Sequence, residues 1–241
     1  MLDATARAER DHFWFRGFRR FVEPLVAQAV AGRPRAAILD CGCGTGYNLV
    51  MLRRYGRAAG IDLTFSGLRH ATRRGERAVT QASATHLPFG DLQFDLVTSF
   101  DVLYGLPDAA ERMAFDEMRR VLRPGGHVLI NVAALPALRG NHSIFGGEVR
   151  RYTRSLLRER LEQHGFAVRR ITYTNATILP IVAGVRFMQR LGGHRVSQQE
   201  ISVPSAPINS ALSALLAAEA AALRLVDMPL GSSLLALAVK R

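Results

Sequence analysis

The fold is decided by the stretch Ile38-Leu39-Asp40-Cys41-Gly42-Cys43-Gly44-Thr45-Gly46-Tyr47-Asn48. A short apolar run leads into three glycines at alternate positions, and residues compatible with a helix follow. This order predicts a strand, a tight loop and the first turn of a helix. Glycines let a loop backbone approach a ligand closely, and the N–H groups of the loop and the helix N-terminus suit a polar or anionic group.

The glycines follow the pattern Asp-x-Gly-x-Gly-x-Gly, which differs from the Gly-x-Gly-x-x-Gly fingerprint of dinucleotide-binding proteins. A second acid, Asp62, ends the next apolar stretch, at the position from which a carboxylate binds a ribose diol. At these residues the sequence resembles the class I S-adenosylmethionine-dependent methyltransferases. The alternative is an ordinary strand-to-helix turn in another Rossmann-like protein. The resemblance implies S-adenosyl-L-methionine as the cofactor, bound by Asp40, Gly42, Cys43, Gly44, Gly46 and Asp62.

Length and composition favour one α/β domain of 241 residues with a modest insertion. The two cysteines, Cys41 and Cys43, both lie in the glycine loop, so they predict neither a disulfide framework nor a metal site, and they fit a cytoplasmic protein. We expect no signal peptide, because charges run through residues 1–37. We also expect no transmembrane segment, because the longest apolar run, 176–185, stops at Arg186.

The net charge of +12 raises nucleic acid as a partner. All but one of the 32 basic residues are arginines, and they are scattered along the chain rather than clustered. No recognised nucleic-acid-binding module accompanies them in the sequence. A small-molecule acceptor is therefore the favoured partner, and RNA is the alternative.

Strands and helices alternate over residues 38–134, which predicts a doubly wound, Rossmann-like α/β sheet with mostly parallel strands. We expect seven strands, of which the last, 232–239, is antiparallel and pairs with 166–175. Ligands in such sheets bind at the carboxyl ends of the strands. The chain is expected to form a single methyltransferase domain, 1–241, made of a helical lid (1–35), a core sheet with helices (36–175), a helical cap insertion (176–231) and the last strand (232–241).

Residues 3–31 are predicted to be helical and carry a dense group of aromatic side chains. The segment 12–17, His-Phe-Trp-Phe-Arg-Gly, resembles an N-terminal element of a subgroup of small-molecule methyltransferases. That resemblance implies a lid over the methionine end of the cofactor, with Trp14 and Arg16 as cofactor-binding residues. The competing interpretation is a helix that docks on the domain by packing alone.

Residues 81–89 carry the adenine-binding residues that the resemblance implies. The family has an Asp near the adenine amino group where this chain has Ser83, and a hydroxyl accepts a hydrogen bond without supplying charge. The backbone N–H of Ala84 is expected to contribute instead. Leu63 and Leu87 are expected to be apolar walls for the adenine ring.

Residues 99–108 resemble the segment that follows the fourth strand in the family. The resemblance implies that Asp101 and the backbone around Phe100 face the methyl donor. Tyr104 and Gly105 stand where the family usually has Glu and His. The two-proline signature of amino-methyltransferases is absent from the sequence, which argues against N-methylation of DNA bases.

The segment 141–153 runs from a loop into a helix that Thr153 is expected to cap and that Gly165 is expected to end. It resembles the same small-molecule subgroup at His142, Arg150, Arg151, Tyr152 and Thr153, whereas Ser143 and Glu148 depart from that pattern. An oxygen acceptor would benefit from a general base, for which Asp101, His142 and Tyr152 are candidates and Glu148 a further alternative. The competing interpretation is a structural joint, in which the tyrosine packs, an arginine pairs with an acid and the threonine caps the helix.

One carboxylate, Glu219, falls inside the apolar stripe of the helix predicted for residues 208–226. A lone buried carboxylate is costly, so we expect Glu219 either to pair with an arginine or to line the acceptor pocket.

These segments predict a methyltransferase that acts on a small, partly hydrophobic acceptor by O- or N-methylation in secondary metabolism, without a metal. Three alternatives stay open. They are an RNA or tRNA methyltransferase, a methyltransferase-like enzyme that binds the cofactor and catalyses another reaction, and a non-catalytic partner of an active homologue.

Overall fold

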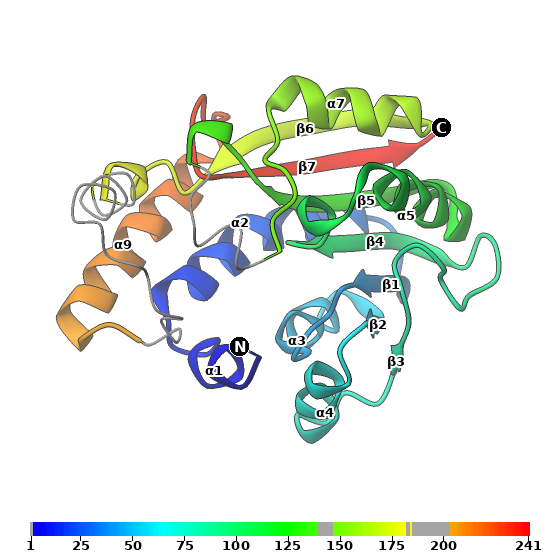
Figure 1. Cartoon of the computed structure of the whole chain (residues 1–241), viewed down its shortest axis with the longest axis horizontal. Coiled ribbons are helices and arrows are strands. Elements are labelled where there is room, and N and C mark those ends of the chain that lie inside the picture. The colour runs from blue at the N-terminus through cyan, green and yellow to red at the C-terminus, as the bar shows by residue number, and fades with distance from the viewer. Residues whose placement is uncertain (1, 139–146, 182–183, 185–202) are drawn as a thin grey trace.

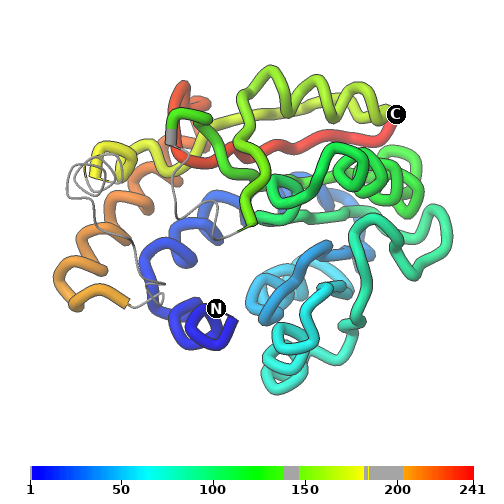
Figure 2. The backbone as a smooth tube through the Cα atoms, in the orientation of Figure 1, coloured from blue at the N-terminus to red at the C-terminus, as the bar shows by residue number. Residues whose placement is uncertain are grey.

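A computed structural model of the chain describes residues 2–138, 147–181, 184 and 203–241 (Figures 1 and 2). These residues form a seven-stranded sheet in the order β3-β2-β1-β4-β5-β7-β6, which confirms the predicted Rossmann-like fold. The strands are β1 (Ala36–Cys41), β2 (Gly56–Asp62), β3 (Val79–Gln81), β4 (Phe94–Phe100), β5 (Leu122–Ala133), β6 (Phe166–Thr174) and β7 (Ser233–Lys240).

Strands β1 to β5 pair in parallel, and β7 runs antiparallel to both of its neighbours, β5 and β6. The prediction of an antiparallel last strand that pairs with residues 166–175 is confirmed. Because the parallel strands share one direction, the carboxyl ends of β1, β2 and β4 meet along one edge of the sheet. The glycine loop lies at that edge.

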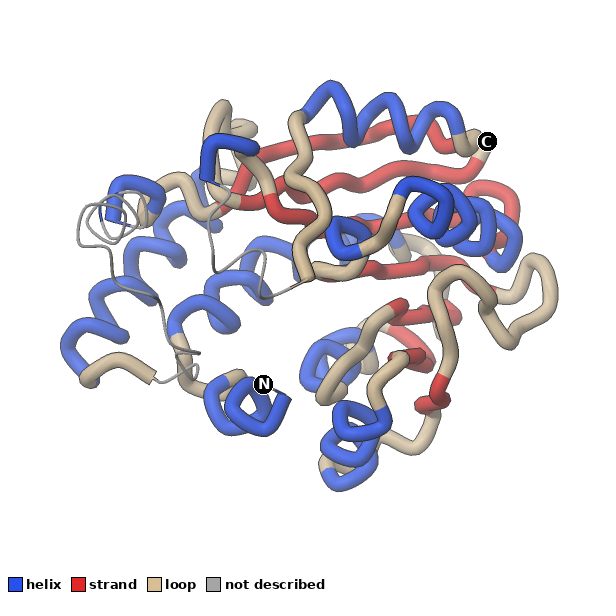
Figure 3. Tube along the Cα trace, in the orientation of Figure 1, coloured by secondary structure: helices blue, strands red, loops and turns tan. Residues whose placement is uncertain are grey.

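Helices cover both faces of the sheet (Figure 3). Side chains of a strand alternate between faces, so Ile38 packs in the cluster under α2, α3 and α9, whereas Leu39 packs in the cluster under α5 and α7. Both clusters consist of buried apolar residues. The helices are α1 (Leu2–Ala8), α2 (Phe13–Ala29), α3 (Tyr47–Leu52), α4 (Phe65–Arg73), α5 (Asp108–Val121), α7 (Arg154–Gln163) and α9 (Ala206–Ala222), with short 3-10 turns η1 (Leu103–Gly105) and η2 (Pro136–Leu138).

The N-terminal segment is two helices, α1 and α2, rather than the single helical stretch predicted over 3–31. His12 separates them, because its Nδ1 accepts a hydrogen bond from the backbone N–H of Trp14 at 3.2 Å and so caps α2. Two other expectations for helix ends hold. Thr153 caps α7 by accepting from the N–H of Leu156 at 3.2 Å, and Gly165 ends it with φ of +76°.

Helices α2 and α9 come from opposite ends of the chain and lie side by side (Figure 1). Gly17 permits their close approach, since a Cβ at this position would lie 2.4 Å from Leu216 Cδ1. The buried Asn209 accepts from the N–H of Phe13 and donates to the carbonyl of Asp11, at 2.8 Å in both cases. The predicted lid and the predicted cap therefore meet in one packed pair of helices, which we call the α2–α9 unit.

Glu219 has a different role from either of the two expected. Its side chain is buried, and its carboxylate accepts hydrogen bonds from the N–H of Ala176 at 3.0 Å and from the N–H and hydroxyl of Thr177 at 2.9 and 2.7 Å. Two backbone N–H groups and the Thr177 hydroxyl thus stabilise the buried carboxylate in place of an arginine. Of the predicted cap insertion, 176–231, residues 182–183 and 185–202 lie outside the described residues. Within the described ranges, no helix is long and apolar enough to cross a membrane.

Candidate functional site

The glycine loop after β1 has three residues in the left-handed region, since φ is +87° at Gly42, +51° at Gly44 and +78° at Gly46. Glycine adopts this conformation at little cost. A Cβ at Gly42 would lie 2.2 Å from Val102, and one at Gly46 would lie 2.7 Å from Ala71. A Cβ at Gly44 would meet nothing within 4 Å. The loop is therefore packed against the protein at its two ends and open in the middle.

Asp62, at the end of β2, is held against this loop. Its Oδ2 accepts a hydrogen bond from the N–H of Gly44 at 2.8 Å, and its Oδ1 accepts from the N–H of Thr64 at 2.8 Å. The next residue, Leu63, is 63% exposed although it is apolar. The structure thus brings together Asp62, Gly44 and Leu63, three of the predicted cofactor-binding residues.

Asp40 lies behind the loop rather than in front of it. The residue is 1% exposed, and Thr98 donates a hydrogen bond to its Oδ1 at 2.6 Å. Burial raises the pKa of Asp40 to about 7, although the Thr98 hydroxyl opposes the shift. Cys43 is buried as well. Because both side chains are buried, the structure does not favour direct contact between a ligand and the side chain of Asp40 or Cys43.

Asp101 follows β4 at the same edge of the sheet. It is exposed and adopts φ of +61°, which is unusual for a residue other than glycine. Asn131 of β5 donates to its Oδ1 at 2.9 Å. Partial desolvation by nearby protein atoms raises the pKa of Asp101 to about 6, against the effect of the Asn131 hydrogen bond.

Asn131 is a site residue that sequence reasoning missed. It is set opposite Phe100 by the register of β4 and β5, and no local motif marks it. Phe100 itself is buried, and its ring packs edge-on against Phe18 of α2 with 5.0 Å between the centroids. The end of β4 is therefore joined to the predicted lid.

The adenine-side residues lie beyond β3. The Ser83 hydroxyl lies 2.8 Å from Thr85 Oγ1 and accepts from the N–H of Thr85 at 3.2 Å, so it stabilises the local turn. Ala84 is buried. Leu87 is only 5% exposed and packs in the core with α5, whereas Leu63 is 63% exposed, so of the two predicted walls Leu63 has the more accessible side chain.

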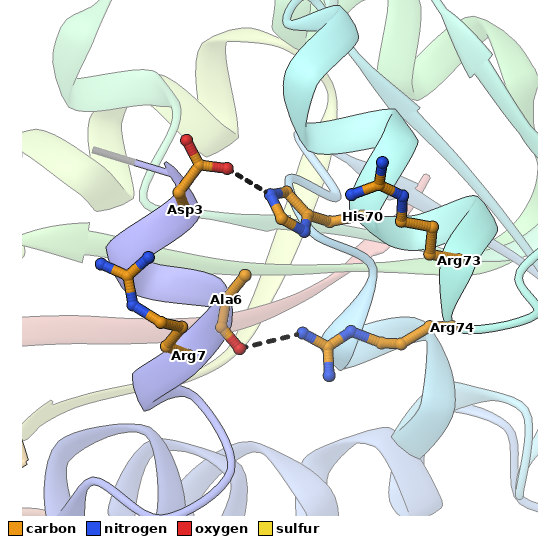
Figure 4. Close-up of a pocket in the computed structure, with 6 residues that line it drawn as sticks. All are labelled: Asp3, Ala6, Arg7, His70, Arg73 and Arg74. Carbon is orange, nitrogen blue, oxygen red and sulfur yellow. Dashed lines mark hydrogen bonds and ion pairs between the residues drawn. The ribbon is translucent and has the colours of Figure 1, made fainter.

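The predicted lid residues differ in exposure. Trp14 is half-buried against the apolar cluster under α2, and Arg16 is exposed. An open groove of about 450 Å³ lies between α1 and α4 (Figure 4). The residues that line it are Asp3, Ala6, Arg7, His70, Arg73 and Arg74, none of which was predicted to bind the cofactor.

The segment 148–153 forms the structural joint that the sequence offered as its second interpretation. Arg151 pairs with Glu148 through Nε–Oε1 at 2.6 Å, and both residues are almost fully buried. Arg150 pairs with Asp108 at 2.6 Å and with Glu111 at 3.1 Å. A base that is paired in this way is not free for an acceptor, so Glu148 is no longer a candidate.

Tyr152 is fully buried, and its hydroxyl donates to Glu111. Burial, together with the Glu111 carboxylate, raises the pKa of Tyr152 well above its usual range. A buried phenol with a raised pKa is a poor general base. The structure thus contradicts a catalytic contact by Tyr152, because the side chain packs in the core. His142 lies outside the described residues.

Comparison with known proteins shows what the chain resembles. Residues 39–130 match a family described as a methyltransferase domain. The chain is 32% identical over 154 residues to malonyl-acyl-carrier protein O-methyltransferase of Herminiimonas arsenicoxydans. The aligned region covers 63% of this chain and 57% of that protein. It is 31% identical over 157 residues to demethylmenaquinone methyltransferase of Mycobacterium sp. (strain KMS), covering 60% of this chain and 63% of that protein. The chain thus matches roughly six tenths of these relatives' length.

The fold has similar solved structures. A chain from the complex of the Haloferax volcanii Trm112 methyltransferase activator with a candidate methyltransferase has a TM-score of 0.64 at 18% identity, and the match covers 98% of this chain and 93% of that chain. The sheet order and the Asp-x-Gly-x-Gly-x-Gly loop define a Rossmann-like methyltransferase domain. Residues 39–130 thus carry a methyltransferase domain, and the chain is similar in sequence and fold to class I S-adenosylmethionine-dependent methyltransferases.

Proposed function

We propose that the chain binds S-adenosyl-L-methionine at the carboxyl ends of β1, β2 and β4 and transfers its methyl group to a small, partly hydrophobic molecule. The observation that carries this proposal is the open glycine loop held by Asp62, with the exposed Leu63 beside it. A carboxylate for a ribose, an apolar surface for a base and a loop with free space suit a nucleoside ligand.

The residues present fit this cofactor. Asp62 would hold the ribose hydroxyls, Leu63 and the backbone at Ala84 would face the adenine, and the loop around Gly44 would receive the amino-acid end. Asp40 supports the loop from behind, and its Oδ2 has no hydrogen-bond partner among the described residues. When bound, the cofactor supplies an electrophilic methyl group on a sulfonium.

Asp101 is the residue we propose for contact with the acceptor. With a pKa of about 6, its carboxylate is mostly ionised at neutral pH and can take a proton from an acceptor O–H or N–H. Asn131 holds one of its oxygens and so fixes the direction of the other. Alignment of acceptor and methyl carbon is expected to supply much of the rate, because positioning alone can be worth several kcal/mol.

A small acceptor is favoured over RNA by the way in which the arginines are used. Many of them pair with acids within the protein, as Arg150, Arg151 and Arg120 do, so these arginines are not available to bind phosphate groups. The two relatives named above act, by their names, on an acyl-carrier-bound malonyl group and on a quinone. An acceptor of this kind would lie between Asp101 and the α2–α9 unit.

The test is calorimetry with S-adenosylhomocysteine, followed by transfer of a labelled methyl group to a panel of acceptors. The panel holds carrier-linked and free carboxylic acids, hydroxyquinones and amines, with total tRNA as a separate arm. We expect binding and labelling of a small molecule. No binding would refute the cofactor assignment, labelling of tRNA alone would refute the small-molecule assignment, and binding without any labelled product would favour a different reaction. The cytoplasmic location stays a prediction from the sequence.

A further inference from the structure

Glu9 joins the N-terminal helix to the glycine loop. It lies at the end of α1 and is 9% exposed, although a single glutamate is usually found at the surface. The hydroxyl of Thr45, the loop residue between Gly44 and Gly46, donates to Glu9 Oε2. The same oxygen lies 3.0 Å from the guanidinium of Arg74, at the end of α4. One carboxylate oxygen thus connects α1, the loop and α4.

The groups around Glu9 bind one another as well. Arg74 Nε donates to the carbonyl of Thr45 at 3.2 Å, and Arg19 of α2 donates to the carbonyl of Glu9 at 3.0 Å. The guanidinium groups of Arg19 and Arg74 lie 4.4 and 4.6 Å from the ring centre of Tyr47, the first residue of α3. Thr45 is therefore fixed through its side chain and its carbonyl at once.

The remaining contacts between α1 and α4 are weaker. His70 lies 2.7 Å from Asp3, but the Asp3 side chain is 74% exposed, and exposed ion pairs contribute little. Arg74 also donates to the carbonyl of Ala6 at a long 3.4 Å (Figure 4). The buried apolar side chains of α1 are only alanines, Ala4 and Ala8. Glu9 is therefore a buried polar anchor at the end of α1.

We propose that Glu9 is a latch that fastens α1 to the glycine loop and holds Thr45 in the conformation that receives the adenosyl cofactor. The proposal rests on the proposed function. Flexible glycines flank Thr45 on both sides, so the loop loses conformational freedom when it orders, and a fixed Thr45 lowers the entropy lost on binding. Because coupling between two equilibria is reciprocal, a bound cofactor also stabilises the docked position of α1.

The experiment compares Glu9→Ala, Glu9→Gln and Thr45→Val in the full chain, with Asp3→Asn as the matched control on the same helix. Calorimetry measures S-adenosylhomocysteine affinity, and hydrogen exchange of residues 2–12 measures the docking of α1. We expect Glu9→Ala and Thr45→Val to weaken binding roughly tenfold, within the usual range of coupling between sites. The double variant should be no worse than either single variant, because both remove one interaction.

The other variants separate the latch from a general loss of stability. Glu9→Gln still accepts from Thr45, so we expect it to stay within about threefold of the unchanged protein, since a neutral hydrogen bond remains. Asp3→Asn should change affinity less than about twofold, as for an exposed pair. Ligand should slow exchange of residues 2–12 in the unchanged protein and in Asp3→Asn, but not in Glu9→Ala.

The latch and the proposed function can fail separately. If the unchanged protein binds S-adenosylhomocysteine and Glu9→Ala binds it equally tightly, the latch is refuted and the proposed function stands. If the unchanged protein does not bind it, the proposed function and the latch both fall. Should Glu9→Ala not fold, Thr45→Val decides the matter, and its unchanged affinity would refute the latch.

Discussion

The glycine loop and the 148–153 joint lie at the same edge of the sheet, after β1 and β5, but they use their polar residues in opposite ways. In the joint, Arg151, Glu148 and Tyr152 are buried and bound to one another or to α5. In the loop, the position at Gly44 faces free space, and the neighbouring Leu63 is exposed. The joint is closed by its own contacts, whereas the loop is left open.

This difference separates two kinds of motif. Both segments match patterns of the same family, so pattern alone assigns both to the active site. A ligand-binding segment must leave hydrogen-bonding groups or apolar surface available, and a structural joint must satisfy them internally. The loop meets the first condition, and the joint meets the second. Four predictions test the distinction.

The largest effect is expected at the joint. Arg151→Ala removes one member of a buried ion pair and should lower the free energy of unfolding by about 3–5 kcal/mol. Urea unfolding measures this loss. The control is Arg158→Ala, which breaks an exposed pair with Glu162 and should cost less than about 1 kcal/mol. Equal losses of stability in the two variants would show that the buried Arg151–Glu148 pair does not stabilise the joint.

Tyr152→Phe tests whether the joint is structural or catalytic. Loss of the hydroxyl that donates to the buried Glu111 should cost about 1.5–3 kcal/mol of stability, as for other hydrogen bonds to charged groups. Labelled-methyl transfer, measured well below the melting temperature, should keep its rate. A large fall in kcat with unchanged stability would restore Tyr152 as a catalytic residue.

Asp62→Ala makes the corresponding test at the loop. We expect S-adenosylhomocysteine binding to weaken by about 1–3 kcal/mol, the range for lost hydrogen bonds to a charged group, with a smaller change in stability than Arg151→Ala produces. Calorimetry measures the affinity. Asp91→Ala, at an exposed ion pair far along the chain, is the control. Unchanged affinity in Asp62→Ala would remove the ribose assignment.

A pH dependence behind the loop provides the fourth test. The folded pKa of Asp40, about 7, lies above the value of about 3.9 expected in the unfolded chain, so the folded state binds more protons between these values. Its contribution to stability is therefore present at low pH and is lost as pH rises towards 7. Asp40→Asn should reduce this slope in melting temperature between pH 5 and pH 8. A parallel slope in both proteins would show that Asp40 does not titrate there.

Particular residues show how far the sequence reaches. The Asp40–Gly46 motif and the acid at Asp62 are local patterns, so the strand, the loop and the ribose-side acid could all be placed from the chain alone. Thr153 and Gly165 mark the ends of α7 for the same reason, because helix caps depend on neighbouring residues. The parallel direction of the first five strands followed from the alternation of strand and helix patterns.

Other properties depend on residues that are distant in the sequence. Asn131 meets Asp101, Glu9 meets Thr45 and Asn209 meets the start of α2 only because the sheet register and helix packing bring them together. The sequence by itself determined a class I methyltransferase fold with a glycine loop. The glycine motif is a short-range signal, and the alternation of strand and helix patterns recurs along residues 38–134. Tertiary structure alone decided which polar residues stay open to a ligand, because burial and partners are set by contacts between elements far apart in the chain.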